Sequence, residues 1–146
     1  MGDSTRSLPK PMLAFGGKPI LEHLIERLAA AGWKEIQLCL GYRPEAVTAH
    51  FGDGSRWGVK LRYHVEKIPR GTAGSVADVR AEIGEDMLVV YGDLYTDMDF
   101  KRFADFHGAH QSSAASIVLI ATDHPFDSDL VRLDGGRLTG LYRAQP

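Results

Sequence analysis

Short apolar runs alternate with segments of helical period along this chain. The runs at 35–40 and 87–91 are strand-like, whereas the apolar side chains of 19–31 recur every three to four residues, as in an amphipathic helix. This alternation is typical of βαβ units, in which helices cover the faces of a mostly parallel sheet. The sequence therefore predicts an α/β fold, and we expect residues 1–146 to form a single domain.

The same patterns predict the individual elements. We expect helices at 19–31, 44–51, 72–83 and 100–110. We expect strands at 35–40, 59–65, 87–91, 114–121, 130–133 and 138–142. The strand at 35–40 is predicted to be short and fully buried.

Bulk properties exclude several classes of protein. A net charge of −2 over 146 residues provides no basic surface for nucleic acid or for an anionic membrane. No apolar stretch approaches the length that spans a bilayer, and no secretory signal follows Met1, so we expect a cytoplasmic protein. Cys39 is the single cysteine, and its apolar surroundings predict a buried side chain rather than a nucleophile.

The run Val89-Val90-Tyr91-Gly92-Asp93 ends a predicted strand with glycine and then a carboxylate. Ligands of open α/β sheets bind at the carboxyl edge of the strands. A carboxylate at that edge, with backbone room beside it, suits a hard cation such as Mg²⁺ that carries phosphate oxygens. The alternative reading of Gly92 and Asp93 is a plain turn after a strand.

A second run, Pro69-Arg70-Gly71-Thr72-Ala73-Gly74, opens a predicted helix. Its glycines allow a ligand to approach the backbone, and a helix N-terminus presents N–H groups to an anion. The alternative is an ordinary helix start with Thr72 as the N-cap. Together with the Gly92-Asp93 run, this loop indicates a nucleotide site.

Lys10 lies between Pro9 and Pro11. The flanking prolines predict an extended backbone that aims the ammonium group, which beside a phosphate would neutralise charge. A solvated loop lysine is the alternative. Asp97 and Asp99 follow Asp93 and suit either a metal site or, for Asp99, the N-cap of the next helix.

Two other patterns carry no chemistry. The run at 15–19 resembles the end of a P-loop, but Pro19 follows Lys18 where Ser or Thr is required. The six histidines lack the spacing of a zinc site.

The ordered motifs resemble the N-terminal half of the sugar-phosphate nucleotidyltransferases. Similar stretches occur in the same order along most of the chain, at 9–13, 17–21, 41–42, 51–54, 66–74 and 92–97. Within that family the chain is most similar to the mannose-1-phosphate and heptose-1-phosphate guanylyltransferase types. The resemblance implies a Rossmann-like, three-layer α/β/α fold with a mixed, mostly parallel sheet.

The resemblance also implies an activity: transfer of a nucleoside monophosphate from an NTP to a sugar 1-phosphate, with release of pyrophosphate. It implies that Lys10 contacts phosphate and that Asp93, beside Gly92, holds Mg²⁺. Gly71, Thr72 and Ala73 would line the nucleobase pocket through their backbone, with Glu66 close by. The implied partners are the NTP and the sugar 1-phosphate, with no nucleic acid and no membrane. A homo-oligomer is compatible with the resemblance.

The chain departs from the family pattern near both ends. The apolar first strand and its Gly-rich loop are missing, and residues 4–6 only echo the end of that loop. The family's Glu-Lys-Pro is replaced by Ala144-Gln145-Pro146. We therefore expect an incomplete enzyme whose 146-residue chain alone is marginally stable and inactive.

Two other functions remain open at this point. A non-catalytic regulatory module on the same fold would bind a nucleotide or sugar phosphate without releasing pyrophosphate. A scaffold that binds only a protein partner would show no rise in melting temperature with nucleotide.

Overall fold

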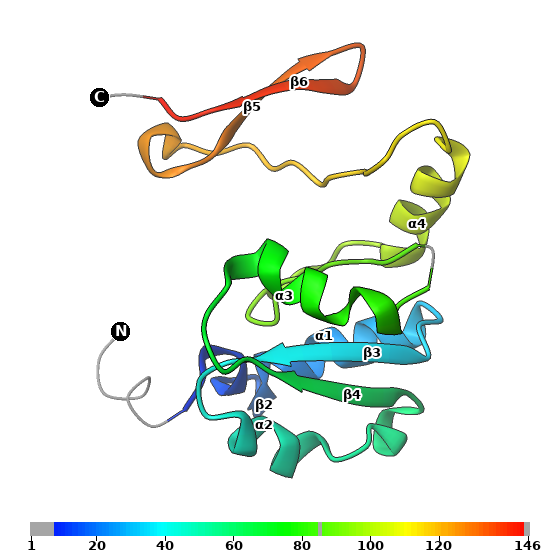
Figure 1. Ribbon diagram of the computed structural model, residues 1–146, viewed down its shortest axis with the longest axis vertical. Coiled ribbons are helices and arrows are strands. Elements are labelled where there is room, and N and C mark those ends of the chain that lie inside the picture. Colours follow the sequence, from blue (N-terminus) through cyan, green and yellow to red (C-terminus); the bar gives the residue numbers. More distant parts are fainter. Residues whose placement is uncertain (1–7, 85, 145–146) are drawn as a thin grey trace. The chain divides into compact units, whose positions relative to one another are not determined.

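The computed structural model describes residues 8–84 and 86–144. The chain divides into two compact units, Met1–His110 and Gln111–Pro146. Whether the chain acts as a single domain stays a prediction. The first unit contains the parallel strands, the main helices and all of the predicted site residues (Figure 1).

Helix α1, Ile20–Ala30, organises the core of the first unit. Pro19 precedes it, and Gly32, at a φ of 102°, follows its last turn, so the predicted helix is confirmed to within one residue at each end. Its apolar stripe packs against side chains from helix α2 (Pro44–Phe51), strand β4 (Lys60–Val65) and helix α4 (Phe100–Ala109). The buried cluster contains Leu21, Leu24, Ile25, Leu28, Val47, Phe51, Val59, Leu61 and Phe100. Each such side chain contributes about 1.5–3 kcal/mol by leaving water.

The parallel pair β3, Glu35–Leu40, and β4, Lys60–Val65, forms the central layer. Helix α2, Pro44–Phe51, connects them, and the register runs from Glu35 opposite Lys60 to Leu40 opposite Val65. These bounds agree with the predicted strands and helix. One face of the pair packs on the α1 cluster, and the other faces α3, so the unit has three layers (Figure 1).

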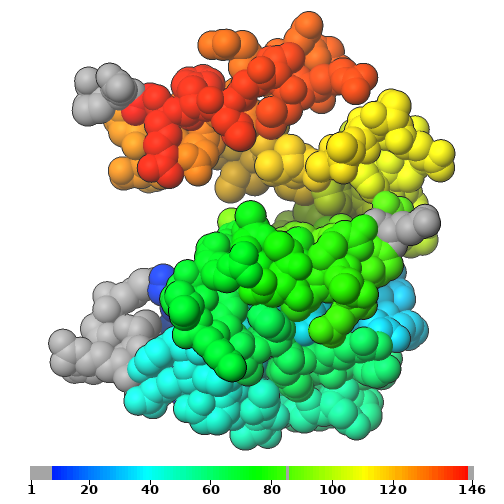
Figure 2. Space-filling view, in the orientation of Figure 1, coloured from blue at the N-terminus to red at the C-terminus, as the bar shows by residue number. Residues whose placement is uncertain are grey.

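Helix α3, Gly71–Val79, continues into a 3₁₀ turn, Arg80–Glu82, close to the predicted 72–83 helix. It contributes little to the core, because Val79 is its one buried residue among those described. Polar contacts attach it to the sheet: the Cys39 thiol lies 3.9 Å from the Ser75 carbonyl oxygen, and His64 Nε2 lies 3.6 Å from Asp78 Oδ2. Figure 2 shows its side chains on the surface of this unit.

The prediction that 35–40 is fully buried is wrong. Glu35 and Cys39 are exposed and the other residues of β3 are half-buried. The reason is that β4 is the one strand paired with β3 in the described part of the chain, which leaves the opposite edge of β3 open.

The segment 87–91 was predicted as a strand, yet it pairs with no other strand among the described residues. Its side chains still alternate as a strand's do. Leu88 and Val90 pack against the α1 cluster, whereas Met87, Val89 and Tyr91 are exposed. The pattern therefore identified an extended segment correctly, but a strand also requires a hydrogen-bonded neighbour.

A small antiparallel hairpin precedes α1. Strands β1, Ala14–Phe15, and β2, Lys18–Pro19, pair across Gly16 and Gly17, whose φ angles are 58° and 86°. Positive φ at both central residues is the requirement of a type I′ turn, which glycine meets without strain. The glycines of 15–19 thus make a hairpin turn, in agreement with the rejection of a P-loop.

Helix α4, Phe100–Ala109, ends the first unit, one residue short of the predicted 100–110. The Asp99 carboxylate accepts a hydrogen bond from the Arg102 backbone N–H at 2.9 Å. Asp99 is therefore the N-cap of this helix, which was one of its two predicted roles.

The second unit is an antiparallel pair, β5, Leu130–Asp134, and β6, Arg137–Tyr142, preceded by a 3₁₀ turn, Pro125–Asp127. Both strands were predicted. The predicted strand at 114–121 is wrong, because this stretch pairs with nothing described, and Ile117 to Ile120 are exposed. In the described residues, every helix is too short or too polar to cross a membrane.

Candidate functional site

A cavity of about 540 Å³ lies in the first unit, between α1 and α3. The whole of β3 lines one side, and residues 86–92 line the other. Its walls are mainly apolar, with α1 contributing Leu24 and Leu28 and α3 contributing Val76 and Val79. It therefore lies in the central layer, beside the open edge of β3.

Residues from three predicted elements line this cavity. They are Pro11, Thr72 and Gly92. A Cβ built on Gly92 would lie 3.7 Å from Pro11 Cγ and 3.7 Å from Leu21 Cδ1. The backbone at Gly92 thus packs on the residue that follows Lys10, so the Lys10 turn and the Asp93 turn are neighbours.

Lys10 does not have the extended backbone that its prolines predicted. It begins a 3₁₀ turn, Lys10–Met12, closed by the Met12 N–H to Pro9 oxygen at 2.9 Å and the Leu13 N–H to Lys10 oxygen at 3.1 Å. Proline is tolerated at position 11, because a backbone N–H in the first turn of a helix has no partner within the helix and proline has no such hydrogen to donate. The turn, rather than the extended form, sets the exposed position of Lys10 at the surface.

Asp93 is exposed in a turn that follows the extended 87–91 segment. The Leu94 N–H donates to the Tyr91 carbonyl at 3.3 Å. Downstream, the Tyr95 ring packs on Phe15 and His23, with ring centroids 4.6 and 5.4 Å away. The loop that carries Asp93 is therefore attached to α1 and to the hairpin before it.

The start of α3 has a backbone that requires its glycines. Gly71 has a φ of 70°, and a Cβ on Gly74 would lie 2.3 Å from Arg70 Cβ. Arg70 is the N-cap, without a side-chain cap, so the alternative in which Thr72 is the N-cap is wrong. Backbone N–H groups of Gly71, Thr72 and Ala73 belong to an uncapped first turn, which can donate to a ligand.

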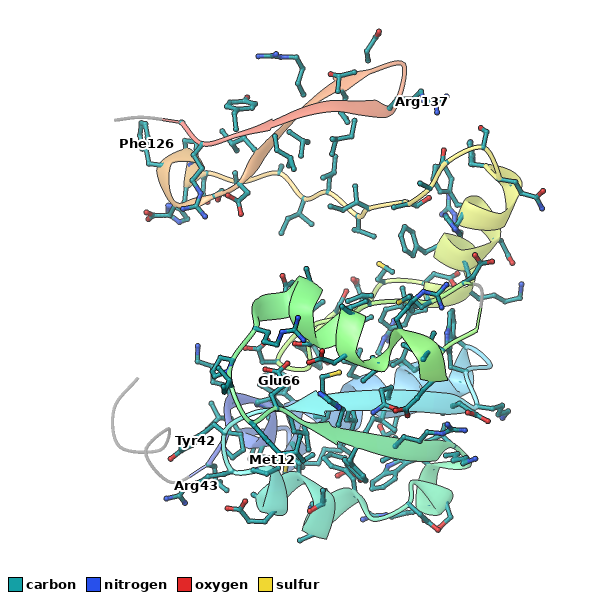
Figure 3. The ribbon with its side chains drawn as sticks, in the orientation of Figure 1. Met12, Tyr42, Arg43, Glu66, Phe126 and Arg137 are labelled. Carbon is teal, nitrogen blue, oxygen red and sulfur yellow. The ribbon has the colours of Figure 1, made fainter. Side chains whose placement is uncertain are left out.

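Glu66 connects the strand ends to α3. Its backbone N–H donates to the Leu40 carbonyl at 2.8 Å, and its carboxylate accepts from the Ser75 hydroxyl. Figure 3 shows Glu66 together with Tyr42 and Met12 at the carboxyl end of β3. Glu66 is thus linked through Ser75 to the start of α3, because the Ser75 hydroxyl also lies 3.0 Å from the Gly71 carbonyl oxygen. That Glu66 lies near a nucleobase pocket stays a prediction.

Cys39 lines the cavity and is exposed, so the prediction of a buried cysteine is wrong. The side chain faces α3 rather than the α1 core because alternate residues of a strand point to opposite faces. Partial desolvation, followed by the nearby carboxylates of Glu66 and Asp78, raises the pKa of its thiol. A raised pKa leaves less thiolate at neutral pH, which disfavours a nucleophilic role.

The carboxylates near Asp93 do not form a preassembled metal site. Among the described residues, no three His, Cys, Asp or Glu side chains are grouped to hold a metal ion. Asp99 caps α4, which leaves Asp93 and the exposed Asp97. Mg²⁺ commonly takes one or two carboxylates together with waters and substrate phosphates, so a lone carboxylate such as Asp93 matches that donor set only with a bound nucleotide.

Two contacts at the site were not predicted from the sequence. Arg43 has a φ of 49° and its guanidinium lies 5.5 Å from the Tyr42 ring centroid, directly after β3. Left-handed backbone at a residue other than glycine is uncommon and concentrates at functional sites. The Phe15–His23–Tyr95 cluster joins segments far apart in sequence, so spacing could not reveal it.

Residues 4–6 and Gln145, where the chain departs from the family pattern, lie outside the described residues.

The sequence matches the nucleotidyl transferase family over residues 3–130. A mannose-1-phosphate guanylyltransferase of Mycobacterium tuberculosis is 39% identical over 109 residues, which are 74% of this chain and 30% of that protein. The mannose-1-phosphate guanyltransferase of Candida albicans is 38% identical over 125 residues, 83% of this chain and 34% of that protein. The chain thus spans about a third of the length of these relatives.

Solved structures agree on the fold. A putative glucose-1-phosphate thymidylyltransferase from Bacillus anthracis superimposes with a TM-score of 0.85 over 98% of this chain and 58% of that one, at 21% identity. HddC from Yersinia pseudotuberculosis superimposes with a TM-score of 0.63 over 68% of this chain and 45% of that one, at 30% identity. The chain belongs to the nucleotidyl transferase family and has its Rossmann-like α/β fold.

Proposed function

We propose that this member of the nucleotidyl transferase family supplies the NTP site of an enzyme that joins a nucleoside monophosphate to a sugar 1-phosphate. The reaction forms an NDP-sugar and releases pyrophosphate. GTP is the first nucleotide to test, because the relatives from M. tuberculosis and C. albicans are named guanylyltransferases.

The observation that carries the proposal is that three elements line one cavity. The turn after Lys10, the first turn of α3 and the Gly92–Asp93 turn come from distant parts of the sequence, yet Pro11, Thr72 and Gly92 line the same cavity. An ammonium group, uncapped backbone N–H groups and a carboxylate are the set that a magnesium-bound triphosphate requires.

The proposed chemistry asks for no protein nucleophile. A phosphate oxygen of the sugar 1-phosphate attacks the α-phosphorus of the NTP, and the bond from the α-phosphorus to the bridging oxygen breaks, so pyrophosphate leaves with both electrons. Lys10 neutralises negative charge on the phosphates, and the backbone of residues 71–73 orients the base. Positioning and charge neutralisation supply most of the catalysis in such transfers.

Asp93 is the residue that we propose would hold Mg²⁺, together with oxygens of the nucleotide. When bound there, the ion would neutralise phosphate charge and fix the geometry of the triphosphate. The chain's own part is to keep Asp93 in place, which the packing of Tyr95 on Phe15 and His23 supports.

Calorimetric titration with GTP, with and without Mg²⁺, tests the site. Lys10→Met should weaken GTP binding about tenfold under both conditions, because one charge-assisted phosphate contact is lost. Asp93→Asn should remove most of the gain in affinity that Mg²⁺ provides, while leaving magnesium-free binding nearly unchanged.

Matched controls come from the same unit. Lys60→Met removes an exposed lysine from β4, and Asp86→Asn removes an exposed carboxylate at the opposite end of the cavity. Both should bind GTP as the wild-type chain does. If Asp86→Asn lost the magnesium effect and Asp93→Asn kept it, the proposed site would be wrong.

Release of pyrophosphate separates catalysis from binding alone. Production of GDP-sugar from GTP and mannose 1-phosphate by this chain would establish the transfer. Tight, magnesium-dependent GTP binding without pyrophosphate would establish the nucleotide site alone, as expected both of an incomplete enzyme and of a regulatory module on the same fold.

A further inference from the structure

The loop that carries Asp93 has little regular structure of its own. Residues 93–99, all of which the structure describes, contain no helix or strand, and Asp93 is exposed. At the far end of the loop, Asp99 caps α4. At the near end, the Leu94 N–H donates to the Tyr91 oxygen at 3.3 Å. A loop with so few internal hydrogen bonds takes its position from the elements that it contacts.

His23 of α1 contacts the near end of this loop through an aromatic cluster. The ring centroid of His23 lies 5.4 Å from that of Tyr95, and the Phe15 ring packs on the same Tyr95 at 4.6 Å. His23 Nε2 lies 2.8 Å from the Phe15 carbonyl oxygen. A carbonyl oxygen can only accept, so Nε2 carries the hydrogen and donates. His23 therefore contacts both the Tyr95 ring and the hairpin strand that packs on it.

The hairpin that carries Phe15 has a second attachment to α1. Lys18 of β2 pairs with the Glu26 carboxylate, and both side chains are partly buried. The hairpin is thus attached to one helix at two points, His23 and Glu26. Helix α1 therefore also holds the Phe15 ring against Tyr95.

Arg27 contacts the far end of the loop. Its Nη2 donates to the Met98 carbonyl oxygen at 3.0 Å, and the Met98 N–H donates to the Thr96 hydroxyl oxygen at 3.1 Å. His23 and Arg27 are four residues apart, so they lie on the same face of α1. Between that face and the loop is a small recess, lined by His23, Leu24, Arg27, Leu94, Tyr95 and Thr96.

Helix α1 is a suitable support for such contacts. Leu24 and Ile25, which lie between His23 and Arg27 in the sequence, are buried in the main apolar cluster. Close-packed side chains leave the helix little freedom to shift. Proteins commonly orient a metal-binding side chain through partners on rigid elements that do not touch the metal.

We propose that His23 and Arg27 are positioning residues, which together hold the loop 93–98 so that the Asp93 carboxylate meets the magnesium-bound nucleotide. Their role rests on the proposed function, in which Asp93 holds Mg²⁺ with oxygens of the nucleotide. A loop that is ordered beforehand loses less freedom when the ion binds. The two residues therefore raise the affinity for magnesium-GTP and leave magnesium-free binding unchanged.

Calorimetric titration of the complete 146-residue chain measures the magnesium gain, the ratio of GTP affinity with Mg²⁺ to that without it. His23→Leu should lower this gain about two- to tenfold, the effect of one lost hydrogen bond, and Arg27→Met should lower it within the same range. His23→Gln, whose amide nitrogen can donate to the Phe15 carbonyl, should recover most of the loss. An equal fall in affinity with and without Mg²⁺ would indicate a general structural role and would overturn the inference.

A double-mutant cycle tests whether His23 acts through Asp93. In the Asp93→Asn chain, the carboxylate that His23 is proposed to position is absent, so adding His23→Leu should change the remaining magnesium gain little. If His23→Leu lowered the gain as much in that chain as in the wild type, His23 would act elsewhere and the inference would be wrong.

Two variants are matched controls, because each loses the same kind of contact away from the loop. His110→Leu removes a ring whose Nδ1 lies 2.7 Å from the Phe106 carbonyl oxygen. Arg80→Met removes a guanidinium that donates to the Ile83 carbonyl oxygen at 3.2 Å. Both should keep the wild-type magnesium gain. A loss as large as that of His23→Leu would contradict a specific role for α1.

Hydrogen exchange in the chain without nucleotide separates the two proposals. The amides of Leu94 and Met98, which both donate within the loop, should exchange about two- to tenfold faster in His23→Leu and at the wild-type rate in His110→Leu. Unchanged exchange in His23→Leu would overturn the positioning role. A wild-type chain without a magnesium gain would instead refute the magnesium site at Asp93, and the exchange rates alone would then decide whether α1 orders the loop.

Discussion

Helices α1 and α3 cover opposite faces of the same strand and are attached to it in different ways. Four apolar residues of α1, Leu21, Leu24, Ile25 and Leu28, are at most 7% exposed. Helix α3 buries Val79 alone among its described residues and depends on polar contacts such as those of Ser75 and Asp78. The stability of the unit therefore lies on the α1 face, whereas the candidate site uses the face that is less tightly packed.

This division is chemically reasonable. Apolar burial contributes stability in proportion to area and tolerates little change. A helix held by a few hydrogen bonds and ion pairs can adjust when a ligand binds to its first turn. The following changes test whether the two faces differ as the packing indicates.

The largest expected difference is between Ile25→Ala and Val76→Ala. Ile25 is fully buried in α1, so its truncation should lower the free energy of unfolding by about 2–5 kcal/mol. Val76 is half-buried beside the cavity, and its truncation should cost less than about 1.5 kcal/mol. Urea denaturation followed by tryptophan fluorescence measures both; equal losses would mean that the two faces are packed alike.

Gly74→Ala should perturb α3 without removing any contact. The added Cβ would lie 2.3 Å from Arg70 Cβ, so the helix start must shift, at a cost of about 1–3 kcal/mol. GTP affinity should fall in the same variant, because the first turn of α3 moves. Gly84→Ala, where a Cβ meets no atom within 4 Å, is the matched control and should leave GTP binding unchanged.

Acid should affect a turn on the α1 side in a defined direction. The Ser55 backbone N–H donates to Asp53 at 2.9 Å and lowers the pKa of that carboxyl. A lowered pKa in the folded state means that the stabilisation is present above the unfolded pKa and is lost as pH falls through the folded pKa. Asp53→Ala should thus lower the melting temperature at neutral pH by a few degrees, a difference that should disappear as the pH falls through the lowered folded-state pKa of Asp53.

A smaller pH-dependent effect is expected on the α3 side, in the reactivity of the Cys39 thiol. Desolvation raises the pKa of the Cys39 thiol, and Glu66 and Asp78 raise it further. Glu66→Gln keeps a group that can accept from Ser75 but removes one negative charge, so the pH profile of Cys39 alkylation should move to lower pH. A profile that stays in place would show that the carboxylate of Glu66 does not influence the thiol.

The sequence identified the local elements well, because their signals are local. The bounds of β3 and α2 agree with prediction to the residue, and Gly32 follows α1 as expected. The segments 87–91 and 114–121 were predicted as strands from composition, but pairing depends on neighbours that no local pattern specifies. The same limit explains the exposure of β3 and of Cys39.

The candidate site was predictable in outline and not in detail. The prediction that Gly71 and Asp93 lie at one edge rests on the position of parallel strand ends, and their neighbours Thr72 and Gly92 line one cavity. The 3₁₀ turn at Lys10 was not predicted, because a residue before proline usually avoids helical backbone. The contacts of Tyr95 with Phe15 and His23 depend on tertiary packing alone.

Hydrogen exchange with and without magnesium-GTP tests the central claim most directly, since it reports which backbone segments the nucleotide orders. We expect slower exchange in residues 71–76 and 91–94 and in the turn at Lys10, with exchange in α1 unchanged because the core already protects it. No protection in the complete chain, or protection confined to segments away from the carboxyl end of the cavity, would contradict it.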